Sequence, residues 1–474
     1  MLAPSRKHLP RLFRLVLLVF VVYAFCWVKG WPQYYDDEEL PPSKRPQSST
    51  QLGPHQVNHD QLVVSVITTA TNAYAKVAPL IATTNNEDHD SLLLFSDLQV
   101  EIGRWPVFDV ISRFSRNFIR ETKELGRYKA QVDYSRKSIP IHKLKRHAPG
   151  EEERLLATLS KFKILQAMAA AWEYRPDRDW YTFVDDETYI NRANLLDWLS
   201  QHDPESKRFF GNPPTSGVPD AFAAGGSSFI LSRKAMKELF HDRKDLIKNW
   251  EKKIADHTSA FDLVFNVLQT ELKLNLEGAW PGISGFAPST VPFSPAVWCE
   301  PVLVMHHVSP ETGSVLWKLE NDRTKDHLMH NPLRFADLWE RFMTPENLND
   351  TRNEWDNLSS ESSNSRWNIL FEEDQPDTGR ARHGEESAEA CSESCDKAKY
   401  CMQWSYSSVP QTNWNDNPQT RCHLSSSVRF GAHTEPQTVI INGVTTPLAW
   451  KSGWKKTKFT AWANRERCKA QHQR

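Results

Sequence analysis

Apolar residues in the first half of the chain form short continuous runs that alternate with longer stretches of helical spacing. The runs at 62–69, 92–97 and 180–184 are rich in aliphatic, aromatic or β-branched residues and predict buried strands. A helix is expected at 75–81, and another at 154–174, where apolar side chains recur every three or four residues. Because strands alternate with helices, the pattern predicts an α/β fold with a parallel or mixed sheet covered by helices on both faces.

The third of these strands leads directly into three consecutive carboxylates, Asp185, Asp186 and Glu187, and Asn191 then caps a new helix. Adjacent like charges repel, so a folded protein keeps them together only where a cation offsets the charge or solvent screens it. Carboxylate oxygens at the end of a strand suit Mg²⁺ or Mn²⁺ carrying a diphosphate. Ligands of open α/β sheets also bind at this edge. A solvated acidic turn is the alternative, and the triplet alone does not decide between them.

A glycine pair and one helical carboxylate are further candidates. Gly225 and Gly226 occur among small residues, where the backbone can approach a ligand closely, although a simple tight turn explains them equally well. Asp262 lies in the first turn of a helix predicted at 259–272 and off its apolar stripe. A carboxylate there is most often a helix-dipole residue, and a functional role is the second interpretation.

The run at 298–308 predicts another strand, which ends in His306 and His307. Adjacent histidines are more often incidental than ligands. These two nevertheless follow a strand, as the acidic triplet does.

The N-terminus carries a targeting signal. An unbroken apolar run at 15–28 is preceded by four basic residues and followed by Lys29. The positive-inside rule then predicts a cytoplasmic tail at 1–11, an uncleaved anchor at 12–29, and a lumenal body beyond a polar stem at 30–60. A cleaved signal peptide is the alternative, but no small-residue cleavage pattern follows the run. Because a short span suits a thin membrane, we expect a single-pass type II protein of the Golgi membrane.

The length of 474 residues indicates two or three domains. The formal net charge of −1 provides no field that would draw the protein onto nucleic acid, which is therefore not an expected partner. We place the main domain at 61–343, a polar linker at 344–387 and a small module at 388–474. The sequons at Asn349 and Asn357 are candidate N-glycosylation sites in this polar stretch.

Six cysteines follow the predicted anchor, in a compartment that permits disulfides. Cys299 stands alone in the central region, and Cys468 lies near the end of the chain. The other four crowd into one short segment of the C-terminal module: Cys391, Cys395, Cys401 and Cys422. Four cysteines allow three pairings, so their spacing alone leaves the connectivity open.

Taken together, these motifs resemble glycosyltransferase family 31, the fringe and core-1 β-1,3-galactosyltransferase-like enzymes, and most closely its fungal type II membrane members. The resemblance covers about 60–340 and rests on these motifs: Phe95-Ser96-Asp97, Lys161-Phe162-Lys163 with Arg175-Pro176-Asp177, Trp180 to Tyr189, Gly225-Gly226, and Trp298 to Pro310. It implies a GT-A (Rossmann-like nucleotide-sugar-binding) fold, a UDP-sugar donor, a divalent cation, inversion at the anomeric carbon and a β-1,3 linkage.

The resemblance also assigns roles to residues. Glu187 and His306 would hold Mn²⁺ (or Mg²⁺), with Glu187 replacing the aspartate usual at that position. Asp185 and Asp186 would orient the ribose and the sugar. Asp262 would be the general base that takes the proton from an acceptor hydroxyl. The remaining donor-binding residues would be Asp97, which contacts the nucleoside, Lys163, Gly225 and Gly226. The sequence also departs from the family pattern at Phe261 and at Ser227-Ser228.

The C-terminal module resembles a PAN/apple-like domain, and that resemblance favours the pairs Cys395–Cys401 and Cys391–Cys422. Such modules bind protein or carbohydrate, although a purely structural role is equally compatible.

With the family resemblance, the sequence predicts a metal-dependent inverting hexosyltransferase that moves a sugar from a UDP-sugar to a glycan or glycoprotein hydroxyl. A non-catalytic lumenal binding protein with a degenerate transferase core is the first alternative. A metal-dependent hydrolase is a more distant one, because such enzymes usually group more His and Asp ligands.

Overall fold

The structure is a computed structural model. It describes residues 58–144, 149–212, 228–325, 332–343, 348, 351–359, 368–370, 383–409, 419–435, 437–441, 443–463 and 468. The predicted tail and anchor, and the stem up to residue 57, lie outside these residues. Within the described ranges, no helix is long and apolar enough to cross a membrane.

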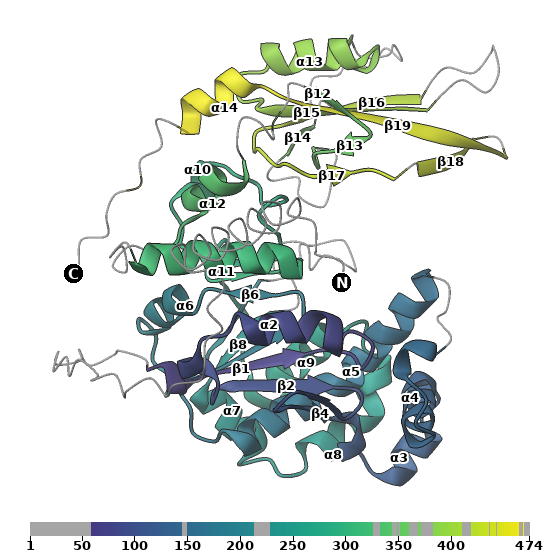
Figure 1. Ribbon diagram of the computed structural model, residues 1–474, viewed down its shortest axis with the longest axis vertical. Helices are drawn as coiled ribbons and strands as arrows, with labels where there is room; N and C mark the ends of the chain where they lie inside the picture. The colour runs from purple at the N-terminus through teal and green to yellow at the C-terminus, as the bar shows by residue number, and fades with distance from the viewer. Residues whose placement is uncertain are drawn as a thin grey trace, which may run out of the picture. The chain divides into compact units, whose positions relative to one another are not determined.

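An eight-stranded mixed sheet forms the centre of the main domain, with the strand order β3-β4-β2-β1-β5-β8-β7-β9 (Figure 1). Its strands are β1 (Leu62–Ile67), β2 (Leu92–Ser96), β3 (Val100–Ile102), β4 (Trp105–Asp109), β5 (Trp180–Asp185), β7 (Phe209–Gly211), β8 (Phe229–Ser232) and β9 (Glu277–Gly278). β1 pairs in parallel with both β2 and β5, and Ile67 lies opposite Phe95 on one side and Asp185 on the other. The predicted strands and the mixed α/β class are therefore confirmed, and the acidic triplet begins at the carboxyl edge of the sheet.

Helices cover both faces of this sheet, because its strands alternate between two apolar surfaces. Val63 and Phe183 belong to the apolar core shared with α5 (Pro149–Tyr174) and α9 (Ala260–Leu272). Val64 and Val184 belong to the opposite core. There the covering helices are α2 (Ala78–Ala82) and α6 (Arg192–Leu199), and α11 (Pro310–Lys325) contacts α2. The remaining helices of this domain are α3 (Arg116–Glu121), α4 (Gly126–Arg136), α7 (Arg233–Phe240), α8 (Leu246–Trp250), α10 (Pro295–Trp298) and α12 (Phe335–Phe342).

The segment predicted as a helix at 75–81 is built differently. It consists of a π-helix, Ala73–Val77, followed directly by α2. Pro79 lies in the first turn of α2, where its missing N–H has no intrahelical partner to lose. π-Helices are rare and are frequently found at functional sites.

A small second sheet brings two distant parts of the chain together. It has the order β10-β11-β6, with β6 at Tyr189–Ile190, β10 at Ile283–Ser284 and β11 at Val304–Met305. β11 is antiparallel to β6, and Met305 lies opposite Tyr189. The strand predicted at 298–308 is therefore wrong in extent, since Pro295–Trp298 is helical and only Val304–Met305 is strand. The histidines still follow a strand.

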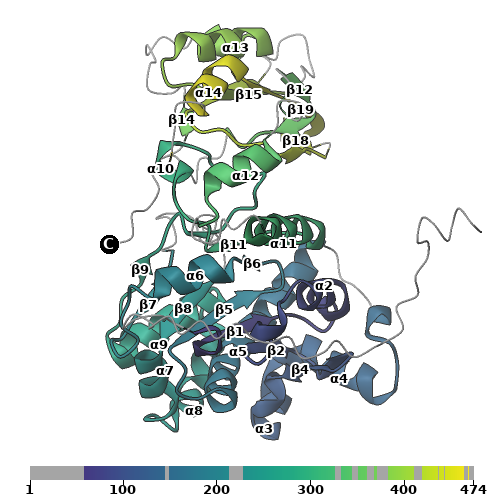
Figure 2. The ribbon, with the colours of Figure 1, turned by 60° about the vertical axis from the view of Figure 1, so that its left-hand side comes forward.

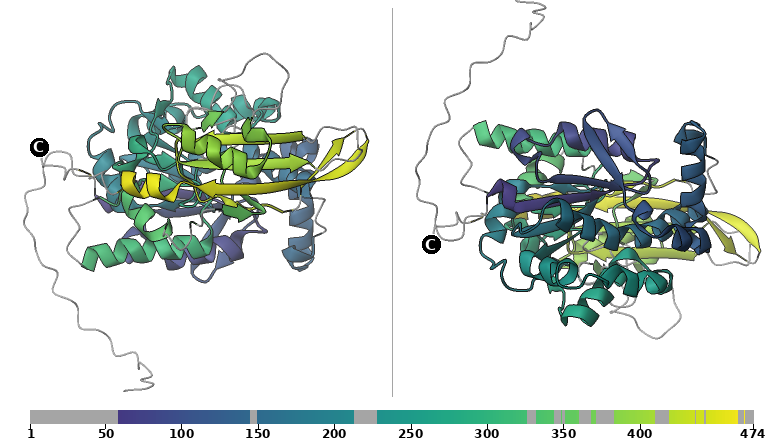
Figure 3. Two further views of the ribbon diagram at one scale, coloured as in Figure 1. Left: turned by 90° about the horizontal axis from the view of Figure 1, so that it is seen from above. Right: turned by 90° about the horizontal axis from the view of Figure 1, so that it is seen from below.

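The C-terminal module contains a six-stranded sheet with helix α13 lying across it (Figures 1 and 3). Its strands are β12 (Thr351–Asn353), β14 (Asn368–Leu370), β15 (Gln403–Val409), β16 (Gln419–Ser425), β18 (Gln437–Ile441) and β19 (Val444–Trp454). Its helices are α13 (Ala388–Lys397) and α14 (Lys456–Ala463), and β13 (Trp355–Asp356) pairs with β17 (Ala432–His433). The predicted linker at 344–387 is thus wrong in part, because it supplies β12, β13 and β14.

The C-terminal module packs on the main domain through aromatic side chains. Trp462 of α14 lies 4.9 Å from Trp298, and Phe459 lies 5.5 Å from Trp339 of α12, measured between ring centroids. Figure 2 labels the helices α10, α12 and α14 that carry these residues. Cys299 and Cys468 form a disulfide in the same region. The sequence did not predict this pair, because 169 residues separate the two cysteines and no motif links them.

Within the module, the disulfides Cys391–Cys422 and Cys395–Cys401 confirm the favoured pairing. The prediction for Asn357 is wrong. Its side chain is fully buried, and its Nδ2 donates to the Trp404 carbonyl at 3.0 Å. In the folded protein this position leaves no space for a glycan on the amide. Asn349 lies outside the described residues.

Candidate functional site

The acidic turn after β5 is held by its own first residue. Asp185 Oδ1 accepts hydrogen bonds from the Glu187 backbone N–H at 3.0 Å and from Thr188 Oγ1 at 2.8 Å. Aspartate side chains commonly close turns in this way. The local sequence therefore fixes the direction in which Asp186 and Glu187 leave the sheet.

His306 reaches this turn because β11 pairs with β6. Its backbone N–H donates to the Ser284 carbonyl at 2.9 Å, and its Nε2 lies 2.5 Å from Asp185 Oδ2. Burial lowers the pKa of His306, but the hydrogen bond to Asp185 and the charges of Asp185 and Glu187 outweigh it, so the pKa is raised. The other ring nitrogen, Nδ1, is buried and has no hydrogen-bond partner among the described residues.

Glu187 contacts two different groups through its two carboxylate oxygens. Oε1 lies 2.5 Å from Lys76 Nζ, and Oε2 lies 3.5 Å from His307 Nδ1. The His307 contact and the Lys76 contacts outweigh burial and lower the pKa of Glu187 to about 2, so this carboxylate is ionised at neutral pH. His307 itself has a φ of 57°, an uncommon conformation for a residue with a side chain.

The donor atoms of this cluster suit a divalent cation. Ligand atoms of Glu187, His306 and His307 all lie within 4.8 Å of one another. One carboxylate with imidazole nitrogens is a ligand set that first-row divalent ions such as Mn²⁺ accept. The buried, unpartnered Nδ1 of His306 adds to the fit, and Asp185 orients that ring, as carboxylates often do for metal-binding histidines. Both histidines, and not His306 alone, are therefore candidate ligands by geometry.

Asp185 itself does not occupy the position that the sequence predicted for it. Both of its oxygens are engaged by protein groups, namely the turn and His306. The prediction that it orients the ribose or the sugar is thus not supported by this geometry. Its contacts place it behind the cluster as a positioning residue.

Asp186 is more nearly enclosed. Its Oδ2 accepts from Thr68 Oγ1 at 2.5 Å, and its Oδ1 lies 3.8 Å from Lys76 Nζ. Burial raises the pKa of Asp186 despite the opposing effects of Thr68 and Lys76. The side chain lines a cavity of about 120 Å³ between the sheet, α2 and α11, together with Lys76, Tyr189, Trp317 and Glu320.

Asp97 and Lys163 are brought together, but neither is accessible to a donor. Both side chains are buried, with 0% and 1% exposure. Asp97 Oδ1 accepts from the Ala70 N–H at 2.7 Å, and Lys163 Nζ donates to the Thr68 carbonyl at 2.5 Å. The prediction that they contact the donor directly is therefore corrected: they hold the loop after β1 in place.

Asp262 lies in the first turn of α9, as predicted, with Ser259 as the N-cap. Its Oδ2 accepts from the Thr258 N–H at 3.0 Å and lies 3.2 Å from His257 Nδ1. Asn266 donates to its Oδ1 at 2.8 Å. Burial acts to raise the pKa of Asp262, but the Thr258 and His257 contacts outweigh it and lower the pKa, so the side chain is ionised at neutral pH.

Aromatic contacts tie the start of α9 to the end of β5. Phe261 lies 6.3 Å from Phe229, which lies 5.0 Å from Phe183, measured between ring centroids. Phe183 is two residues before Asp185. Asp262 therefore lies on the same edge of the sheet as the acidic turn. Gly225 and Gly226 fall outside the described residues.

Lys76 is the functional candidate that sequence reasoning missed. It is the cation nearest to Glu187 and Asp186 in the described part of the chain. A signal was present, since the segment after β1 begins at the same sheet edge as the acidic triplet. The sequence alone did not indicate that a π-helix would direct this lysine into the cluster.

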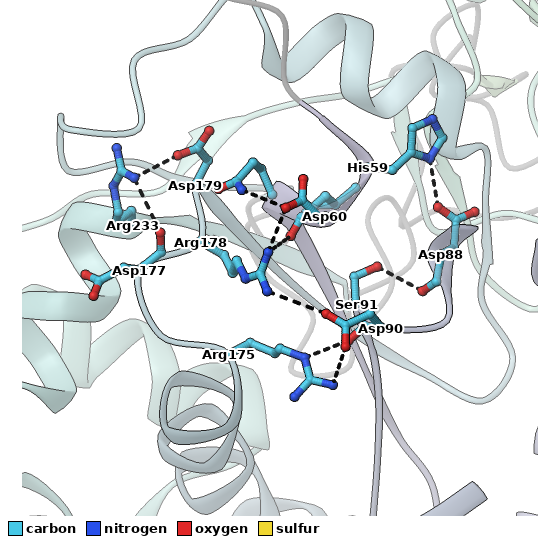
Figure 4. Close-up of polar contacts among 12 residues, drawn as sticks. His59, Asp60, Asp88, Asp90, Ser91, Arg175, Asp177, Arg178, Asp179 and Arg233 are labelled. Carbon is cyan, nitrogen blue, oxygen red and sulfur yellow. Dashed lines mark hydrogen bonds and ion pairs between the residues drawn. The ribbon is translucent and has the colours of Figure 1, made fainter. Parts of the chain in front are cut away.

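A second group of possible ligands, His59, Glu87 and Asp88, lies near the start of β1, away from the acidic turn. Asp88 Oδ1 already pairs with Arg192 Nε at 2.7 Å and with His59 Nδ1 at 2.8 Å. Figure 4 shows it within a wider set of Asp–Arg pairs that tie the ends of several elements together. These contacts neutralise the carboxylates, so we assign this group a structural role.

The fold and the cluster define an α/β protein with a candidate metal-binding site at the carboxyl edge of a central strand. Comparison with known families narrows the class for one part of the chain. Residues 154–273 match the family model described as Fringe-like, a group within glycosyltransferase family 31. The matched segment includes the acidic triplet and Asp262 and ends before His306. The family is one of glycosyltransferases.

Proposed function

We propose that this protein is a metal-dependent inverting glycosyltransferase with a GT-A fold. The donor is a UDP-sugar and the acceptor a hydroxyl of a glycan or glycoprotein, with a β-1,3 linkage. The observation that carries the proposal is that Glu187, His306 and His307 lie close together at the end of β5. Glu187 is inside the Fringe-like segment, and the two histidines are outside it.

In this proposal, Glu187 and His306 hold Mn²⁺ or Mg²⁺, and His307 is available as a third ligand. The bound cation would neutralise negative charge as the UDP leaving group departs. Asp185 fixes the orientation of His306, because it contacts the imidazole at 2.5 Å. Asp97 and Lys163 fix the loop after β1 against the same edge.

Asp262 is the proposed general base. A base must be ionised before it can take a proton, and the lowered pKa of Asp262 satisfies that condition. Both of its oxygens accept hydrogen bonds from neighbouring groups, but the side chain is about one-third exposed, so an acceptor hydroxyl could reach a remaining lone pair. The proton would pass from that hydroxyl to a carboxylate oxygen of Asp262 as the acceptor oxygen attacks the anomeric carbon opposite UDP.

The proposal places the protein in the Golgi membrane as a single-pass type II protein, with the described residues in the lumen. Three disulfides in the structure agree with an oxidising compartment. The C-terminal module is proposed to be PAN/apple-like and to assist acceptor recognition. Its aromatic contacts with α10 and α12 would hold it at a fixed position on the main domain.

A calorimetric titration of the lumenal body with UDP, with Mn²⁺ and then with a chelator, tests the proposal. Binding that needs Mn²⁺ supports a transferase site. If UDP does not bind under either condition, a non-catalytic binding protein with a degenerate core becomes the better account.

A further inference from the structure

The ion pair between Lys76 and Glu187 uses the oxygen that faces away from His307. Glu187 Oε1 contacts Lys76 Nζ, while Oε2 faces His307. A divalent cation that binds Glu187 must therefore share this carboxylate with the ammonium group or displace it. Two cations on one carboxylate repel each other, so Lys76 and the metal oppose each other's binding.

The position of Lys76 is set by the backbone rather than by a flexible loop. It lies in the π-helix Ala73–Val77, and its N–H donates to the Asn72 carbonyl at 2.9 Å. Thr68, at the other end of the same loop, is held through its carbonyl by Lys163 and through its hydroxyl by Asp186. The lysine side chain is 28% exposed and lines the cavity beside Asp186.

The charges of the site suggest what Lys76 binds after displacement. Three carboxylates lie at the end of β5, and in the absence of a metal Lys76 offsets part of their charge. A divalent cation would take over that function and leave the ammonium group without its counterion. A diphosphate bound to that cation would bring new negative oxygens to the same place, and ammonium groups are common phosphate ligands.

We propose that Lys76 exchanges partners: it pairs with Glu187 in the free protein and binds the diphosphate of the donor once a divalent cation occupies the cluster. This inference rests on the proposed function, because it assumes a nucleoside diphosphate donor. It adds a donor-binding residue that also weakens binding of the metal alone. The protein would then bind the metal and the nucleotide together more tightly than it binds either one alone.

The test uses Lys76→Met in the full lumenal protein, with Lys76→Arg as the charge-conserving variant and Lys234→Met as a surface control. Lys234 pairs with Glu238 on its own helix and is 43% exposed. Binding of Mn²⁺ alone, followed by electron paramagnetic resonance, should become tighter in Lys76→Met by roughly 3–10-fold, because the competing charge is gone. Binding of UDP at saturating Mn²⁺ should weaken on the order of tenfold, because a charge-assisted contact is lost.

Opposite changes in the two affinities are the signature of the exchange, and uridine, which lacks phosphates, should bind equally to the parent and to Lys76→Met. Lys76→Arg should remain near the parent in both assays. If Lys76→Met weakens Mn²⁺ and UDP binding together, the lysine merely supports the structure of the site and the inference is overturned. Unchanged affinities overturn it as well. If the parent protein itself fails to bind UDP, the proposed function fails, whereas a Lys76→Met effect on Mn²⁺ alone would still report the competition.

Discussion

Asp185 and His306 are 121 residues apart in sequence, yet Asp185 Oδ2 and His306 Nε2 lie 2.5 Å apart. The contact joins the end of β5 to the end of β11 and orients the imidazole beside Glu187. Through this contact His306, which lies outside the residues that match the Fringe-like model, is held next to the acidic triplet inside them.

Asp262 should be essential for transfer but not for donor binding. Asp262→Asn keeps the size of the side chain and can still accept at Oδ1, but it cannot take a proton. Loss of a positioned base typically costs about 10²–10⁴-fold in rate. UDP release from UDP-galactose, UDP-glucose or UDP-N-acetylglucosamine with a glycoprotein acceptor measures the rate, and calorimetry measures UDP binding. Transfer at the parent rate would mean that Asp262 is only a helix-dipole residue.

Glu320 should make the stability of the protein depend on pH. Burial is the main cause that raises its pKa to about 7, although the hydrogen bond from Tyr189 opposes this. The unfolded chain has a lower pKa, near 4.5. The folded state therefore binds the proton more tightly, and stability falls as the pH rises from about 4.5 to about 7.

The matched variant is Glu320→Gln, which retains a hydrogen-bonding side chain but does not ionise. Relative to the parent, it should gain on the order of 3 kcal/mol between pH 4.5 and pH 8, because a shift of one pKa unit corresponds to about 1.4 kcal/mol. Thermal unfolding of both proteins across this range measures the difference. A constant difference between the two melting temperatures would show that Glu320 does not titrate in this window.

The disulfide between Cys299 and Cys468 should hold the end of the chain to the main domain. Non-reducing peptide mapping should recover the two cysteines in one cross-linked species. Cys299→Ser should lower the free energy of unfolding by about 2–4 kcal/mol, a typical contribution of a native disulfide. It should also speed proteolysis after α14. A Cys391→Ser variant is the control, because it opens a disulfide within the module. Recovery of Cys299 and Cys468 as free thiols would contradict the pairing.

Asn357 should carry no glycan when the protein is expressed through the secretory route. Its amide donates to the Trp404 carbonyl, and its Oδ1 accepts from Ser359 Oγ at 2.7 Å, so both ends are used inside the module. Mass spectrometry of glycosidase-treated peptides should therefore show no deamidation at this position. The Asn349 peptide serves as the internal comparison. A glycan at Asn357 would contradict the buried position.

A feature could be predicted from the sequence where it depends on neighbouring residues, and could not where it depends on residues far apart in the chain. β1, β2, β5 and α9 could be predicted because their apolar spacing is local. Asp185 to Glu187 could be placed at the sheet edge for the same reason. The role of Asp185 could not, because it depends on the register of β11 against β6. The role of Lys76 could not be predicted either, since the direction of its side chain depends on the π-helix. Asn357 was wrongly predicted to be exposed, because its neighbours pair with a strand about 100 residues further along the chain.

The central claim is that Glu187 and His306 hold the cation needed for UDP binding. It is tested most directly by calorimetric titration of UDP at fixed Mn²⁺ into the parent, Glu187→Ala and His306→Ala, with Glu173→Ala as an exposed carboxylate control. His307→Ala should have a smaller effect, because its side chain is mostly exposed. The account predicts that the first two variants weaken Mn²⁺-dependent UDP binding by about 10–100-fold while their thermal unfolding remains cooperative. Parent-like, Mn²⁺-dependent binding in both variants would contradict it.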